Sequence, residues 1–333
     1  MVRQFAGNNV LVLFFLPFIP LLNLMLEYYF PTLIHAQNIE TNLWGLNLQN
    51  SFNWLLGMFA IILIVGNAIL LNGIFNRHEF YSKNTYLPSL IYVSLTTFFP
   101  YSVYVNGELF AQTFLILLVY QLFRLKQNED GRSAVFLGAL FLGMAITLNS
   151  IYLFVIPFLW MSIARIRPFV LREYLLSLLG LLTPFLYLFF VNQNFLSKIF
   201  HFDAVLNYQN IDGYFIWILY LLLLILMIFS YLSISRKLPK STIRYKRLLS
   251  VVLYVLAFTI LISITTNYFF NTIYYFASGS ISLAFILPYA YLESKAQKVT
   301  SIIILLLILL SYFKFFSNLI NLEIQNSPFH KMK

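Results

Sequence analysis

Cysteine is absent from this chain of 333 residues, and charged residues make up only 10% of it. The absence of cysteine excludes disulfides, thiolate metal ligands and cysteine nucleophiles. Because soluble domains carry about 25% charged residues, the low charge content also excludes an ordinary water-soluble globular protein. Side chains that can carry chemistry are therefore few.

Histidine is also scarce, with four residues that lie far apart in the sequence. No two of them have the HxxxH or HxxH spacing of a zinc or iron site built from protein ligands alone. We therefore expect no cofactor, apart from a weakly held Mg²⁺ or Mn²⁺ that would be shared with a phosphate group.

Long apolar runs dominate the rest of the chain, in which 61% of the residues are hydrophobic and the mean hydropathy is +0.82. One bilayer crossing takes about 20 residues. The sequence therefore predicts an all-α polytopic transmembrane bundle of about 9–11 spans, forming one integral membrane domain over residues 1–333. Residues 134–163 fit either two short helices or one re-entrant pair. The candidate spans are 10–26, 54–75, 86–104, 109–123, 134–149, 151–163, 174–192, 214–234, 248–266, 272–291 and 299–316.

The positions of lysine and arginine predict the orientation of these spans. With the amino terminus inside, seventeen of the 21 basic residues fall in the inner segments, and the other four are Lys198, Lys314, Lys331 and Lys333. Cytoplasmic loops favour lysine and arginine, so the amino terminus is predicted to be cytoplasmic. The frequent use of Phe, Tyr, Ile, Asn and Lys is typical of AT-rich genomes and suggests a bacterial inner membrane.

The net charge of +10 raises the question of nucleic acid binding. The densest basic cluster, Arg236 to Arg247, lies between two predicted spans, where contact with anionic lipid head groups explains it. Nucleic acid binding needs a basic surface with reading elements, and none is present. We expect the lipid bilayer, and not nucleic acid, as the partner of these charges.

Polar residues inside the predicted spans are mainly amides. Ionisable groups that would mark an ion or proton pathway are nearly missing there, which disfavours secondary transport. We expect Asn67, Asn72, Gln112 and Asn149 to form hydrogen bonds between helices, with a role in lining a substrate path as the alternative.

The segment from Thr97 to Arg167 has a characteristic order of helix breaks. Phe99-Pro100 ends one span, Asn106-Gly107-Glu108 opens the next, and a glycine-containing helix leads through Pro157 to a basic exit. This order resembles the middle of the GT-C superfamily, the polytopic glycosyltransferases that take sugars from polyprenyl-phosphate carriers. The segment is also similar to uncharacterised bacterial inner-membrane proteins.

The GT-C resemblance implies catalytic acids at two places on the outer side. Glu27, near the end of the first span, matches the position of an acidic residue that acts as base or holds a divalent metal, although the family commonly has two acidic residues there. Glu108 matches the acidic residue at the start of the fourth span. Each residue also has an alternative explanation. Glu27 would be an interfacial carboxylate that caps the first span, and Glu108 would be an acid that the helix macrodipole stabilises at the start of its helix.

Lys198 and His201 lie in the second external loop, three residues apart. On a helix they would face the same way, so we expect them to bind the phosphate of a lipid-linked substrate, with ordinary interfacial residues as the alternative.

The sequence leaves two candidate functions. The first is a glycosyltransferase that uses a polyprenyl-phosphate sugar at the outer leaflet. The second is a non-catalytic scaffold subunit that holds a small membrane protein in an envelope-assembly or secretion complex.

Overall fold

The computed structural model describes residues 1–29, 54–98, 105, 107–127, 129–191, 213–270, 279–293 and 296–326. Within these ranges the regular structure is helical and no strand occurs, so the predicted all-α fold is confirmed. The α-helices are α1 (Val2–Phe5), α2 (Phe18–Tyr29), α3 (Trp54–Arg77), α4 (Leu87–Phe98), α5 (Gly107–Arg124), α6 (Arg132–Leu148), α7 (Ile156–Ile166), α8 (Leu171–Val191), α10 (Gly213–Lys237), α11 (Ile243–Phe270), α12 (Gly279–Ile286), α13 (Pro288–Leu292) and α14 (Gln297–Asn326). Among the described residues, three 3₁₀ helices join them: η1 (Val10–Phe15), η3 (Ser150–Val155) and η4 (Leu238–Lys240).

The protein is a multi-pass integral membrane protein. Five helical segments among the described residues are long and apolar enough to cross a bilayer, namely Val10–Tyr29, Trp54–Arg77, Leu171–Val191, Trp217–Lys240 and Ile243–Ile262. Shorter apolar helices lie in other predicted spans, and the break before Pro288 separates α12 from α13. Residues 134–163 form two separate helical segments, which are α6 and the pair η3 and α7.

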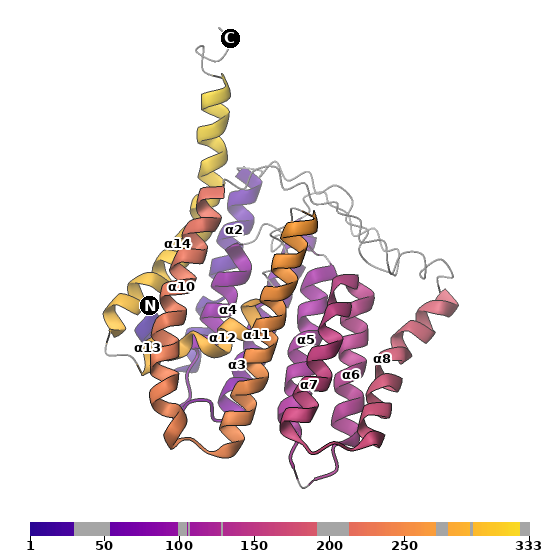
Figure 1. The fold of residues 1–333 in the computed structure, drawn as a ribbon. Coiled ribbons are helices and arrows are strands. Elements are labelled where there is room, and N and C mark those ends of the chain that lie inside the picture. Colours follow the sequence, from indigo (N-terminus) through magenta and orange to yellow (C-terminus); the bar gives the residue numbers. More distant parts are fainter. Residues whose placement is uncertain are drawn as a thin grey trace.

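Helix α4 lies at the centre of one part of the bundle. All of its residues are buried, as are all residues of α12. Helices α2, α3, α12 and α14 pack against α4, and α11 packs against both α12 and α7. Figure 1 shows α11 between this group and the layer of α5, α6, α7 and α8. The short helices thus form the interior, and the long apolar helices surround them.

Helices α6 and α8 pack closely because Gly180 of α8 has no side chain at their contact. A Cβ atom on Gly180 would lie 2.5 Å from the carbonyl oxygen of Phe136 and 3.0 Å from the Cβ of Ala139. Small residues at such contacts let helix backbones approach each other in a membrane, where van der Waals packing drives association.

The predicted inner segments meet at one end of the bundle, which we call the basic end. The guanidinium group of Arg167 donates to the carbonyl oxygen of Lys126 at 3.0 Å, and that of Arg247 donates to the carbonyl oxygen of Ile166 at 3.2 Å. The amide of Tyr86 donates to the carbonyl oxygen of Phe5 at 2.7 Å. The connections α5–α6, α7–α8 and α10–α11 lie together at the lower end of Figure 1. The basic end comprises residues 1–6, 77–86, 124–127, 129–132, 165–172, 236–247, 292–293 and 296–298.

An aromatic cluster holds the basic end together. The ring of Phe80, which is fully buried, lies 5.4 Å from the ring of Phe123, 5.2 Å from that of Phe285 and 5.9 Å from that of Tyr245. These residues come from α5, α12, α11 and the α3–α4 connection. Aromatic pairs at these separations contribute about 0.5–1.5 kcal/mol each beyond the area that they bury, so the cluster fixes how the four segments meet.

We predict that Gly180→Ala destabilises the protein by about 1–3 kcal/mol, because the added methyl group has no room at the α6–α8 contact. Gly66→Ala in α3 is the matched control, since no atom lies within 4 Å of the added Cβ, and it should be neutral or slightly stabilising. The measurement is the apparent melting temperature of each purified variant in detergent. Equal melting temperatures for the two variants would contradict this account of the contact.

Candidate functional site

Glu108 lies in the first turn of α5 and is 3% exposed. The start of α5 comes close to the end of α6, since a Cβ atom on Gly107 would lie 2.6 Å from the carbonyl oxygen of Leu148. Glycine at position 107 therefore brings the carboxyl group of Glu108 next to the residues that follow α6.

Three side chains donate hydrogen bonds to the carboxyl group of Glu108. The hydroxyl of Tyr152 and the amide nitrogen of Gln112, the latter at 3.3 Å, donate to Oε1. The amide nitrogen of Asn149 donates to Oε2 at 2.9 Å. Both carboxyl oxygens therefore have partners, and the side chain is held in one orientation.

Asn149 has its orientation set by the local backbone. Its Oδ1 accepts a hydrogen bond from the backbone amide of Ile151 at 3.2 Å, which makes Asn149 the N-cap of η3. Asparagine is among the preferred N-cap residues. Because the amide oxygen is used in the cap, the amide nitrogen faces Glu108.

A second layer of hydrogen bonds supports Gln112. The hydroxyl of Tyr92 donates to Oε1 of Gln112 at 2.7 Å, and the amide nitrogen of Asn67 lies 3.4 Å from the hydroxyl oxygen of Tyr92. All these hydrogen bonds are donated in one direction, from α3 through α4 and α5 to Glu108. We call this set the Glu108 cluster; it consists of Asn67, Tyr92, Glu108, Gln112, Asn149 and Tyr152.

The Glu108 cluster confirms that three of the four predicted amides, Asn67, Gln112 and Asn149, form hydrogen bonds between helical segments. The fourth, Asn72, has a buried side-chain oxygen that finds no hydrogen-bond partner within the described part of the chain. The sequence did not indicate Tyr92 or Tyr152, because nothing in the pattern around a tyrosine in an apolar run distinguishes a hydrogen-bonded residue from a packing residue.

The partners of Glu108 are all uncharged. In the part of the chain that the structure describes, Glu129, Asp130, Glu173 and Glu293 form ion pairs, and all of these pairs lie at the basic end. Glu108 forms no such pair, which is unusual because an ionisable residue in a membrane bundle is normally paired with an opposite charge.

Glu27 lies in the last turn of α2 and is 2% exposed, so its side chain faces the interior of the bundle. The neighbouring Tyr28 packs its ring 5.6 Å from that of Trp54, at the first residue of α3. Since α3 and α5 both end at the basic end, Glu27 and Glu108 share the opposite end. The hydrogen bonds of Glu108 nevertheless go to Tyr152, Gln112 and Asn149, and none of them joins it to Glu27.

Lys198 and His201, the predicted phosphate-binding residues, lie outside the described residues. Within the described ranges, no three His, Asp or Glu residues lie close enough to hold a metal ion.

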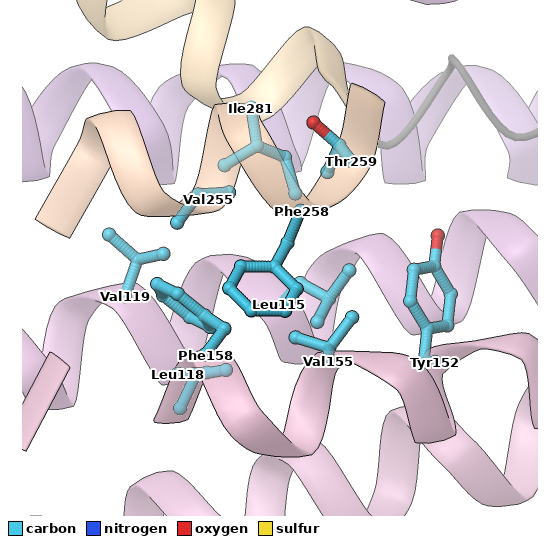
Figure 2. A pocket seen from close by; sticks show the side chains of 10 residues that line it. All are labelled: Leu115, Leu118, Val119, Tyr152, Val155, Phe158, Val255, Phe258, Thr259 and Ile281. Carbon is cyan, nitrogen blue, oxygen red and sulfur yellow. The ribbon is translucent and has the colours of Figure 1, made fainter. Parts of the chain in front are cut away.

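A small cavity lies beside the Glu108 cluster. Figure 2 shows the ring of Tyr152 at its edge and the rings of Phe158 and Phe258 in its wall. The lining is almost entirely apolar, and the volume is about 20 Å³, room for about one water molecule. Ligand pockets are commonly about 300–1,000 Å³, so this cavity is a packing gap between α5, α7, α11 and α12 and not a substrate pocket.

No protein-family model, curated protein or solved structure matches the chain. The resemblance to GT-C enzymes therefore rests on the order of residues in the chain itself.

Proposed function

We propose that this membrane protein is a GT-C-like glycosyltransferase that uses a polyprenyl-phosphate sugar, and that Glu108 is its catalytic base. The observation that supports the proposal is the buried carboxyl group of Glu108, which accepts three hydrogen bonds from neutral donors and pairs with no cation. Burial raises the pKa of Glu108, while the three hydrogen bonds donated to it favour its anionic form. The anion is the form that accepts a proton, and the raised pKa makes it a stronger base.

The proposed reaction is a single displacement at the anomeric carbon of the sugar. Glu108 takes the proton of an acceptor hydroxyl, whose oxygen forms a bond to that carbon. The bond from the anomeric carbon to the carrier phosphate breaks, and the phosphate leaves with the electron pair. A positioned base contributes about 10²–10⁴-fold to such a step.

The other predicted residues have supporting roles in this proposal. Glu27, at the same end of the bundle, provides a second carboxylate that can hold a divalent cation beside the phosphate. Lys198 and His201 bind the phosphate of the carrier, where positive charge stabilises the leaving group.

A scaffold subunit without catalytic activity is the second candidate. It is favoured by the observation that Glu108 is 3% exposed and that its partners join α3, α4, α5 and η3. In that case the cluster holds the bundle together, and the outer helix faces bind a small membrane protein.

Glu108→Gln distinguishes these functions, because it removes the base and keeps the size of the side chain. For the transferase we expect at least about a 100-fold loss of glycan product in cells that depend on this chain, with the protein still folded by its melting temperature and gel-filtration profile. The control Glu79→Gln replaces an exposed glutamate at the basic end and should leave the product unchanged. Full product from folded Glu108→Gln protein would refute the transferase and leave the scaffold.

We also propose that the chain is one integral membrane domain of a bacterial inner membrane, with the basic end in the cytoplasm. The supporting observation is that the predicted inner segments, which carry most of the lysine and arginine residues, meet at one end of the bundle. Cytoplasmic segments are enriched in these residues.

The orientation predicts the behaviour of topology reporters. Reporters fused after Arg132, Arg172 and Lys240 should report a cytoplasmic location, and reporters after Asn50 and Asn207 should report the outside. A cytoplasmic signal at Asn207 would overturn the assignment of the later spans and would remove Lys198 and His201 from the outer face.

A further inference from the structure

Three arginines and one histidine gather at the basic end, where α3 and α5 end and α11 begins. Arg77 is the last residue of α3, and its guanidinium group donates to the hydroxyl of Tyr120 at 2.9 Å. Arg124 is the last residue of α5. The guanidinium carbons of Arg77 and Arg124 lie 5.7 Å and 5.9 Å from the centroid of the Tyr120 ring, so the two cations share one aromatic ring.

His78 lies beside these arginines with both ring nitrogens unused. Its ring packs edge-on against Phe123 at 5.3 Å. Both nitrogens are buried, and neither has a hydrogen-bond partner within the described part of the chain. Burial, and then the charges of Arg244 and Arg77, lower the pKa of His78 to about 4. At neutral pH the imidazole therefore keeps one N–H donor that has no acceptor.

Arg244, near the start of α11, lies in the same region as Arg77 and His78. The next residue, Tyr245, packs against Phe80, which in turn packs against Phe123 under the His78 ring. Arg244 is exposed, and it forms no hydrogen bond or ion pair with any residue in the described ranges. It adds a third guanidinium to the same region.

Four of the acidic residues nearby pair with other cations, and the fifth, Glu79, is exposed and forms no ion pair among the described residues. Glu129 pairs with Lys126, Asp130 with Arg132 and Glu293 with Lys237. Glu173 pairs with Arg167 at 3.0 Å. Among the described residues no carboxylate pairs with Arg77, Arg124 or Arg244, so their positive charge is available to an external anion.

We propose that Arg77, Arg124 and Arg244, which lie around the ring of His78, form a binding site for the phosphate group of an anionic phospholipid. Guanidinium groups bind phosphate oxygens with two parallel hydrogen bonds, and they supply the donors of the site because both ring nitrogens of His78 are buried. The site lies where the apolar segments Trp54–Arg77 and Ile243–Ile262 reach their polar ends, which is the depth of lipid head groups. It is at the opposite end of the bundle from Glu108 and does not depend on the proposed function.

The test compares two double variants that remove the same charge from the basic end. Arg124→Gln/Arg244→Gln removes two unpaired cations of the site, both exposed. Lys126→Gln/Arg132→Gln removes two exposed cations that already have carboxylate partners. The full chain is purified in neutral detergent, and its melting temperature is titrated with phosphatidylglycerol, with phosphatidylcholine or with soluble glycerol phosphate.

We expect phosphatidylglycerol to raise the melting temperature of the unmodified protein at concentrations at which phosphatidylcholine and glycerol phosphate do not. Each lost guanidinium removes charge-assisted hydrogen bonds to the phosphate and lowers the affinity about tenfold, so the site variant should bind phosphatidylglycerol about 100-fold more weakly. The control variant should keep the affinity of the unmodified protein.

Three results would overturn the proposal. Equal weakening in the two variants would show diffuse attraction to the whole basic end. Unchanged affinity of the site variant would show that these arginines do not bind the lipid. An equal response to glycerol phosphate would show that the ligand is a soluble phosphate and not a membrane lipid.

Discussion

A carboxyl group inside an apolar bundle needs hydrogen-bond partners from the protein, because no water is available there to replace them. Glu108 meets this requirement through Tyr152, Gln112 and Asn149. Leaving one buried polar group without a partner costs about 1–3 kcal/mol. The positions of α3, α4, α5 and η3 relative to one another are therefore tied to a single side chain.

The same requirement explains why the bundle has two different ends. At the end that contains Glu108 and Glu27, the carboxyl group of Glu108 is satisfied by neutral donors. At the basic end, ion pairs and contacts with aromatic rings stabilise the charged side chains instead. Lys237 pairs with Glu293 at 3.0 Å, and its ammonium nitrogen lies 4.9 Å from the centroid of the Tyr289 ring. The arginines left without carboxylates at this end are then available to bind phosphate.

The sequence was sufficient to predict the helical membrane fold and the segments that meet at the basic end. Hydrophobic runs and the placement of lysine and arginine are local signals, and they carry this information directly. The sequence also singled out Glu108, Gln112 and Asn149 as polar residues in or near spans. It could not pair Glu108 with Asn149 and Tyr152, which are 41 and 44 residues away, because nothing in a single sequence records which helices become neighbours. It also could not show that α4 and α12 are buried on all faces, because a short helix has the same apolar sequence whether it contacts lipid or other helices.

The central claim is that the bundle holds Glu108 as a carboxylate that accepts hydrogen bonds from its neighbours. Infrared difference spectroscopy of the unmodified protein against Glu108→Gln in lipid vesicles at neutral pH tests this claim directly. We expect the substitution to remove a carboxylate stretching band and no carboxylic acid carbonyl band. Loss of a carboxylic acid carbonyl band instead would show that Glu108 is protonated in the folded protein, and it would contradict both the direction of the hydrogen bonds and the role of Glu108 as a base.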